Sequence, residues 1–213
     1  MIHLYYTKTG SRFEPNFFGS FLEQLPPDMQ KQVLKFRKWE DRQRGMLGKM
    51  LLIKGLESLG HNSSLLNDIK FTSFQKPYFD KPIHFNISHS GEYTICAVSK
   101  TNRVGIDIEE IKDIPLIDFD NEFSKKELEE IYNAKNPLKS FYTLWTQKEA
   151  FLKAIGAGLN VPLNRLAIDK NRITWNKEVW FLKEIKIDPG YISHLSTNDD
   201  LLAITIREVN FTK

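Results

Sequence analysis

Hydrophobic and polar residues alternate at the start of the chain, and the pattern then changes to a helical period. Residues 2–6 predict a strand, and the next segment, which contains Pro15 and Pro26, predicts a loop. Apolar residues recur every three or four positions over residues 40–59, which predicts a helix that ends at Gly60. A shorter helix is expected over residues 28–38, and strands are expected over 69–72, 84–87, 93–98 and 104–109.

Helices followed by strands recur in the second half of the chain. The pattern predicts helices over residues 125–133 and 137–155, and Asn136 and Pro137 suit the N-cap and first positions of the second helix. Strands are expected over 166–168, 173–175, 180–187 and 201–206. No low-complexity linker separates the halves, so we expect an α/β (α+β) protein of two packed lobes, residues 1–102 and 103–213.

The composition is that of a soluble globular protein. The 213 residues are 41% hydrophobic and 27% charged, which excludes a disordered, collagen-like or coiled-coil chain. Cys96 is the only cysteine, so an intrachain disulfide and a cysteine-based zinc cluster are excluded, and a reducing, cytoplasmic location is expected. The sequence predicts neither a secretion signal nor a membrane span, because no apolar run approaches the roughly 20 residues required.

Charge is distributed unevenly along the chain, although the net charge is only +3. Residues 31–54 contain eight basic and two acidic residues, whereas residues 107–130 contain ten acidic and three basic residues. This asymmetry indicates an anionic ligand on one side and a cation or a basic surface on the other. A nucleic-acid partner is not expected, because the acidic segment opposes one.

Two carboxylates on one strand form the first candidate site. In residues 104–109, Asp107 and Glu109 project from one face and Ile106 and Ile108 from the other, while Gly105 leaves room for a ligand or a close backbone. Adjacent carboxylates repel each other, and a magnesium ion with a bound phosphate would relieve that repulsion. The alternative is a solvated strand edge that bears charges.

A helical acid and base form the second candidate. Glu149 and Lys153 lie one turn apart on the helix over residues 137–155, beside an apolar stripe that includes Lys148. An exposed i,i+4 ion pair would explain them without function. A third carboxylate next to a lysine also suits a magnesium diphosphate site, because the lysine offsets charge on transferring phosphates.

Ser88 and His89 form a third candidate at the end of a predicted strand. A serine nucleophile with a histidine base is not favoured, because adjacent side chains on a strand point in opposite directions and no Gly-x-Ser-x-Gly turn is present. Two interpretations remain: phosphate binding by these side chains and nearby backbone donors, or an ordinary β-turn.

Three segments together resemble the signature of the 4'-phosphopantetheinyl transferases. They are Val-Gly-Ile-Asp107-Ile-Glu109, Leu-Trp-Thr-Gln-Lys148-Glu149-Ala-Phe-Leu-Lys153, and the upstream Phe-Asn-Ile-Ser88-His89-Ser-Gly. The length resembles the surfactin-synthetase-activating type of this family. The resemblance implies a monomeric pseudo-dimer of two similar lobes, each a small, mostly antiparallel sheet packed with helices, with the active site and bound coenzyme A in the cleft between them.

The resemblance also implies an activity and a set of site residues. The activity is magnesium-dependent transfer of 4'-phosphopantetheine from coenzyme A to a serine of an apo acyl or peptidyl carrier protein, which releases adenosine 3',5'-bisphosphate and serves fatty-acid, polyketide or nonribosomal-peptide synthesis. The alternative is a coenzyme A or nucleotide-binding module without transfer activity. The implied metal ligands are Asp107, Glu109 and Glu149, the implied catalytic residues are Glu149, Lys153 and Glu127, and the implied coenzyme A contacts are Lys31, Lys35, Arg44, Lys76, Pro77, Ser88, His89 and Lys153.

Two of these positions carry specific questions. Glu127 matches the family position proposed as the base for the incoming serine, yet Ser124 and Glu127 also form a capping-box pattern that explains both residues without catalysis. Glu149 or a magnesium-bound water is the competing base. Gln75 precedes Lys76-Pro77 where the family usually has glycine, so the backbone conformation at this position is in question.

Overall fold

The chain divides into two compact units. The computed structural model of the protein describes residues 1–201 and 203–211, except for the side chain of residue 159. The first unit comprises residues 1–72, 77–101 and 203–211, and the second comprises residues 73–76 and 102–201. No described helix combines the length and apolar composition that crossing a membrane requires.

The first unit is a four-stranded sheet with helices packed on it. The strand order is β10 (Ile204–Glu208), β1 (Ile2–Lys8), β5 (Tyr93–Ser99), β4 (His84–Ser90). The helices are α1 (Pro15–Leu22), α2 (Pro27–Leu34), α3 (Trp39–Ser58) and the short η1 (Ser63–Asp68), and a separate two-stranded sheet pairs β2 (Lys70–Phe71) with β3 (Pro77–Tyr78). Helix α3 lies directly on β5, because a Cβ atom at Gly55 would come within 2.7 Å of Val98 Cγ1.

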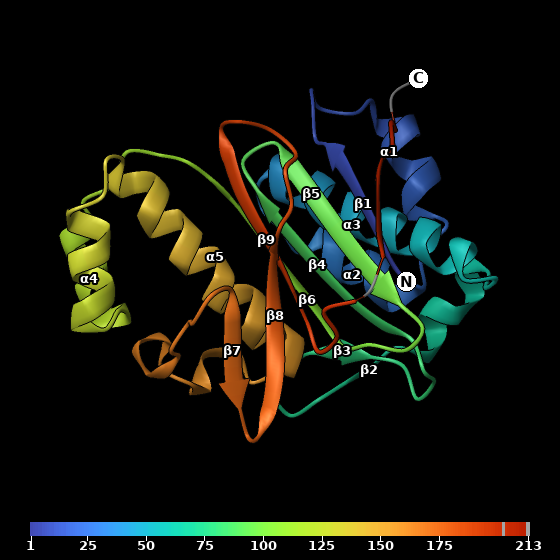
Figure 1. The fold of residues 1–213 in the computed structure, drawn as a ribbon. Coiled ribbons are helices and arrows are strands. Elements are labelled where there is room, and N and C mark those ends of the chain that lie inside the picture. Colours follow the sequence, from blue (N-terminus) through green and yellow to red (C-terminus); the bar gives the residue numbers. More distant parts are fainter. Residues whose placement is uncertain (202, 212–213) are drawn as a thin grey trace. The chain divides into compact units, whose positions relative to one another are not determined.

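The second unit also consists of a four-stranded sheet with helices packed on it. Its antiparallel sheet has the order β6 (Val104–Glu110), β9 (Tyr191–Thr197), β8 (Glu178–Glu184), β7 (Arg172–Trp175). The long helix α5 (Pro137–Ile155) packs along β6 and β9 (Figure 1). The remaining helical segments are α4 (Lys125–Tyr132), η2 (Leu116–Glu122), η3 (Gly158–Asn160) and η4 (Leu163–Arg165).

Gly105 determines how closely α5 approaches the sheet. A Cβ atom at this position would lie 2.1 Å from Ala150 O and 2.3 Å from Ala154 N, so only glycine allows the helix backbone to contact β6. The room that the sequence predicts at Gly105 is therefore filled by a helix. Because side chains alternate along a strand, Asp107 and Glu109 share the face of β6 that is turned toward α5.

Several predicted elements differ from the structure. The loop predicted around Pro15 contains α1, and the helix predicted over residues 28–38 ends at Leu34. The predicted strand over 166–168 was wrong, because residues 166–168 are irregular after η4. Strand β8 ends at Glu184 rather than at residue 187, and β9 was not predicted. The strand expected over 201–206 is β10, which begins at Ile204; residue 202 lies outside the described residues.

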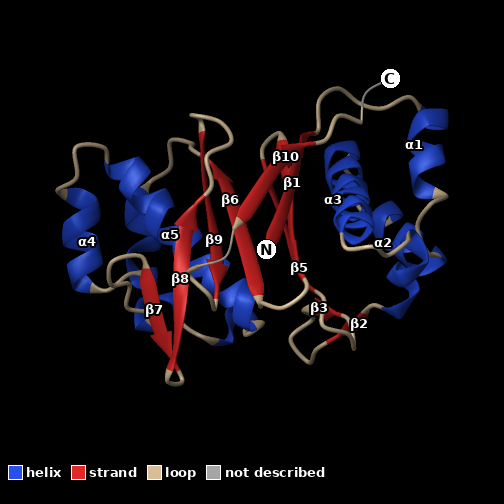
Figure 2. Cartoon of the chain, turned by 45° about the vertical axis from the view of Figure 1, so that its right-hand side comes forward, coloured by secondary structure: helices blue, strands red, loops and turns tan. Residues whose placement is uncertain are grey.

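Two short segments depart from a simple division at residue 102. Strand β10 pairs in parallel with β1 on the side of β1 that β5 leaves open, so residues 204–208 join the first unit (Figure 2). Residues 73–76 group with the second unit, where Lys76 Nζ donates a hydrogen bond of 2.6 Å to Ala154 O at the end of α5.

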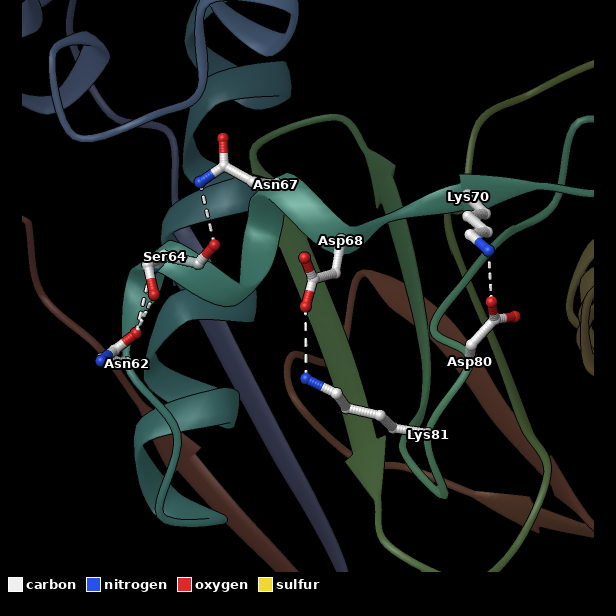
Figure 3. A network of polar contacts seen from close by, with 7 residues as sticks. All are labelled: Asn62, Ser64, Asn67, Asp68, Lys70, Asp80 and Lys81. Atoms are coloured by element: carbon white, nitrogen blue, oxygen red, sulfur yellow. Dashed lines mark hydrogen bonds and ion pairs between the residues drawn. The ribbon is translucent and has the colours of Figure 1, made fainter.

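Two surface ion pairs hold the ends of the segment that contains residues 73–76. Lys81 Nζ lies 3.2 Å from Asp68 Oδ2, and Lys70 pairs with Asp80 (Figure 3). At least half of each side chain in these pairs is exposed, so each pair contributes little to stability.

Candidate active site

An acid cluster occupies the face of β6 that contacts α5. Asp107 is only 2% exposed, and its Oδ1 accepts a hydrogen bond of 2.6 Å from Lys153 Nζ of α5. The ion pair spans strand and helix because the Gly105 contact brings α5 down onto β6. The structure therefore joins one predicted metal ligand to the lysine predicted to contact the diphosphate.

Glu149 lies near the same cluster, one turn before Lys153. Burial raises the pKa of Glu149, the negative charge of Asp107 raises it further, and the charge of Lys153 opposes both effects. Glu122, at the end of η2, also raises the pKa of Glu149. Two carboxylates that repel each other at a partly buried position are stabilised by nearby positive charge. Lys153 supplies one positive charge for the two carboxylates.

This repulsion predicts that Glu149→Gln stabilises the folded protein near pH 7. A carboxyl group whose pKa is higher in the folded state favours folding below its unfolded pKa, and that contribution is lost as the pH rises through the folded pKa. Ionised Glu149 is then a cost at neutral pH, and an amide removes it. Urea unfolding at pH 7 and pH 4 tests this: the gain should be present at pH 7 and absent at pH 4, and an equal difference at both values would contradict it.

Magnesium coordination by Asp107, Glu109 and Glu149 remains a prediction. Hard oxygen donors suit magnesium, which commonly takes one or two protein carboxylates and completes its shell with water and substrate phosphates. Asp107 and Glu149 fit that requirement, since each feels the other's charge. The described residues contain no group of three His, Cys, Asp or Glu side chains placed to hold a metal ion. Glu109, half-buried on the same face of β6, remains a predicted third ligand.

The capping-box interpretation of Glu127 is confirmed. Ser124 Oγ accepts the backbone N–H of Glu127, and Glu127 Oε2 accepts hydrogen bonds from Ser124 N at 2.8 Å and Ser124 Oγ at 2.9 Å. The same oxygen accepts a third hydrogen bond, of 2.7 Å, from Lys148 Nζ. Oε2 is occupied by three donors, so these contacts weigh against the catalytic interpretation of Glu127.

Lys148 is a buried cation. From the sequence it was predicted only to lie in the apolar stripe of its helix. Its side chain is 0% exposed and also donates to Leu163 O at 3.0 Å, while Nζ lies 5.0 Å from the centre of the Phe123 ring. Burial lowers the pKa of Lys148, and the Glu127 carboxylate opposes that shift. A lysine within an apolar helix face indicates a buried acidic partner, because a buried charge must be paired. The sequence alone does not identify that partner, because Glu127 lies 21 residues away.

A buried histidine lies beside the acid cluster. His194 on β9 pairs in register with Asp107, and its Nδ1 lies 2.8 Å from Thr146 Oγ1 on α5. Thr146 Oγ1 also lies 2.7 Å from Tyr142 O; because a hydroxyl has one proton, donation to that carbonyl makes His194 Nδ1 the donor to Thr146. Burial lowers the pKa of His194 to about 4, so the ring is neutral at physiological pH.

His194 therefore predicts an acid-sensitive fold. A histidine whose pKa falls from 6.5 to about 4 on folding adds stability that is present above pH 6.5 and lost as the pH falls through 4. We expect about 3 kcal/mol of the free energy of unfolding to be lost between pH 6.5 and pH 4. His194→Asn should remove this part of the pH dependence in urea unfolding, and an unchanged dependence in the variant would contradict it.

The candidate coenzyme A contacts of the first unit lie on α2, α3, β3 and β4. Arg44 donates to Gly91 O at 2.6 Å and to Asp41 Oδ1 at 2.7 Å, so its guanidinium is fixed at the β4–β5 turn. Ser88 is buried and His89 exposed on β4, which confirms that their side chains take opposite faces. Lys31 pairs with Asp28 at 3.2 Å, Lys35 is exposed after α2, and Pro77 opens β3. A role for these residues in binding remains a prediction.

The loop before Pro77 keeps a glycine-like backbone without glycine. Gln75 has φ of 63°, which is the left-handed conformation that glycine adopts at no steric cost. Lys76 follows and packs against Gly156 at the end of α5; burial and the charge of Arg103 lower the pKa of Lys76 to about 8. Gln75 therefore holds a backbone conformation that glycine would adopt at lower cost.

Strain at Gln75 predicts that Gln75→Gly stabilises the protein by about 1 kcal/mol, since an L-residue in the left-handed region costs about that amount. The side chain is exposed, so its loss should remove little packing. Gln75→Ala is the matched control because it keeps the Cβ atom. The melting temperature should rise for Gln75→Gly only. A rise for Gln75→Ala as well would assign the effect to the glutamine side chain rather than to the backbone.

Comparison with known proteins identifies the family of the chain. Residues 103–205 match the family model for the 4'-phosphopantetheinyl transferase superfamily, and residues 14–101 match the model for the N-terminal part of 4'-phosphopantetheinyl transferases. The chain belongs to the 4'-phosphopantetheinyl transferase superfamily, in its Sfp-type branch, and is an enzyme of that class.

Individual relatives cover most of the chain. It is 30% identical to the transferase Sfp of Bacillus subtilis (strain 168), over 97% of both chains. It is 34% identical to the transferase gsp of Aneurinibacillus migulanus, over 81% of this chain and 73% of the relative. The holo-[acyl-carrier-protein] synthase structure of Thermotoga maritima aligns with 44% of this chain and 61% of its own, at 18% identity and a TM-score of 0.35.

Proposed function

We propose that this enzyme transfers the 4'-phosphopantetheine group of coenzyme A to a serine hydroxyl of an apo acyl or peptidyl carrier protein and releases adenosine 3',5'-bisphosphate. The observation that carries this proposal is the Asp107–Lys153 ion pair beside Glu149. All three residues belong to the motifs by which the chain resembles the family. The arrangement suits diphosphate chemistry, because it combines carboxylates with a lysine that can neutralise phosphate charge.

Lys153 is proposed to change partners during the reaction. Its ammonium group pairs with Asp107, and its side chain is 30% exposed, so it is accessible to an arriving phosphate oxygen. Donation to that oxygen would stabilise the negative charge that develops on the departing bisphosphate. Magnesium bound by Asp107 and Glu149, with Glu109 as a proposed third ligand, would supply Lewis-acid stabilisation of the same charge.

The transfer forms one bond and breaks another. The serine oxygen forms a bond to the β-phosphorus of coenzyme A, and the bond from that phosphorus to the bridging oxygen breaks, so the bisphosphate leaves with the bridging oxygen. The serine proton must pass to a base. The three hydrogen bonds to Glu127 Oε2 favour the capping role of that residue, whereas the raised pKa of Glu149 suits a proton acceptor.

We further propose that the protein acts as a monomer in the cytoplasm. Two observations support this proposal. Each unit has its own four-stranded sheet and long helix, as a single-chain pseudo-dimer requires. Cys96 is fully buried, and burial raises the pKa of its thiol, so it suits a reducing compartment without taking part in chemistry.

Intact mass spectrometry tests the proposed reaction directly. An apo acyl carrier protein and an apo peptidyl carrier domain are each incubated with the enzyme, coenzyme A and magnesium, with and without a chelator. We expect a gain of one phosphopantetheine that the chelator abolishes, and the faster carrier indicates the pathway. If neither carrier gains mass, calorimetry with coenzyme A separates the two remaining cases: binding indicates a module without transfer activity on these carriers, and no binding contradicts the assignment.

A further inference from the structure

An apolar hollow in the first unit is lined by none of the predicted site residues, although Lys35 directly follows its lining residue Leu34. Its walls come from the loop before α1, from α1 itself, from the end of α2 and from the start of α3. We call it the α1–α3 hollow, and its lining residues are Arg12, Phe13, Pro15, Phe18, Leu34, Trp39, Arg42 and Gln43. Its cavity volume is about 200 Å³, which is less than a drug-sized ligand requires and leaves room for a small ligand only.

Hydrogen bonds from a buried glutamine hold the hollow in shape. Gln43 is 1% exposed; its Oε1 accepts from Phe13 N at 2.9 Å, and its Nε2 donates to Thr9 O at 2.6 Å and Ser11 O at 3.0 Å. The loop that contributes Arg12 and Phe13 is thereby fixed to α3. The opposite wall is fixed by Arg42, whose Nε donates to Phe36 O at 2.6 Å. These hydrogen bonds limit the rearrangement that a ligand would require.

Aromatic packing stiffens the same wall. The Phe13 ring lies 5.0 Å from that of Phe17, which lies 4.9 Å from that of Phe21, and both contacts are edge-on. Phe21 in turn packs at 5.5 Å on Phe211. Leu34, at the rim, nevertheless remains 47% exposed, so the hollow leaves apolar surface in contact with water.

The charge of the hollow is positive. Arg12 and Arg42 line it, and no acidic side chain does. Neither arginine forms an ion pair with another residue in the part of the chain that the structure describes. An apolar cavity with two guanidinium groups is complementary to a ligand that has an apolar body and a carboxylate, because guanidinium binds carboxylate through paired hydrogen bonds.

The hollow is not the side of α3 that carries the predicted coenzyme A contact. Arg42 and Arg44 are two residues apart, so helix geometry places them on roughly opposite sides of α3. Arg44 is held at Gly91 O of the β4–β5 turn, whereas Arg42 is held at Phe36 O. No residue assigned to coenzyme A or metal lines the hollow.

We propose that the α1–α3 hollow binds a small amphipathic carboxylate, with the apolar body against Phe13, Phe18 and Trp39 and the carboxylate on Arg12 and Arg42. This binding site is separate from the proposed transfer reaction. It needs neither coenzyme A nor a carrier protein, so the test below does not depend on the proposed function.

Octanoate is the probe, and octanol of the same chain length is the uncharged control. The full chain is titrated with octanoate, and binding is monitored by calorimetry and by ¹H–¹⁵N spectra. The Trp39 Nε1–H and Gln43 side-chain amide signals should shift, and binding should be saturable. Loss of a charge-assisted hydrogen bond should weaken binding about tenfold. We therefore expect an affinity about tenfold lower for octanol, and an affinity of Arg42→Gln for octanoate that is also about tenfold lower. Trp39→Phe identifies the indole signal.

Arg37→Gln is the matched control, because Arg37 is exposed in the same unit and does not line the hollow. It should bind octanoate as the unchanged protein does. Equal affinity for octanol and octanoate, or full affinity in a folded Arg12→Gln/Arg42→Gln variant, would overturn the proposal. So would a concentration-dependent dimer in sedimentation that Leu34→Ser abolishes, because a second copy of the chain would then cover the hollow.

Discussion

The Asp107→Asn variant should lose about 10³-fold in kcat/KM for phosphopantetheine transfer and still fold. An asparagine keeps the size of the side chain but removes the charge that pairs with Lys153 at 2.6 Å and that a bound cation requires. Groups that stabilise developing charge in this way commonly account for about 10²–10³-fold in rate. The backbone contact at this residue, Ser193 Oγ to Asp107 O at 2.7 Å, is unaffected, which favours retention of the fold.

Intact mass of an apo carrier protein, measured over time with saturating coenzyme A and magnesium, gives the rate, and circular dichroism checks the fold. Glu110→Gln is the matched control on the same strand: Glu110 ends β6 and pairs with Lys112 at 2.9 Å, away from the Asp107–Lys153 pair. It should retain most of the activity. Normal turnover of Asp107→Asn at saturating magnesium would remove Asp107 from the proposed metal and phosphate site.

The elements that carry the site were predictable because their signals are local. Helix α5 begins at Pro137 and ends at Ile155 as predicted, since Asn136 Oδ1 accepts the backbone N–H of Lys139 and Gly156 ends the helix in the left-handed conformation. Strand β6 alternates as expected. The same rule applied at Pro15 would have found α1, because proline stands at the first position of that helix as well.

Strand β9 could not be predicted because its polar residues are buried by tertiary packing, which no local pattern reveals. Ser193, His194, Ser196 and Thr197 are all buried, although in sequence they resemble a surface segment. Ser193 donates to Asp107 O on β6, and His194 bonds Thr146 on α5. These partners lie 86 and 48 residues away, so no window of the sequence contains them.

The buried pair Glu127–Lys148 predicts the second large effect. Glu127→Gln should lower the free energy of unfolding by about 3–5 kcal/mol, because it leaves the fully buried Lys148 ammonium without a counter-charge. Glutamine preserves the capping box, since its side-chain oxygen can still accept the Ser124 N–H. The loss would therefore report the charge pair rather than the helix cap. Glu130→Gln on the same helix, where the side chain is exposed, is the matched control.

Adding Lys148→Met to Glu127→Gln separates a structural role of Glu127 from a catalytic one. The double variant replaces the ion pair by an amide and an apolar side chain of similar length, so it should recover most of the lost stability and show strong coupling in urea unfolding. If Glu127 acts only through Lys148 and the α4 cap, transfer activity should return with stability. A stable double variant that still transfers no phosphopantetheine would instead make Glu127 the base, because its carboxylate would then be required in the reaction itself.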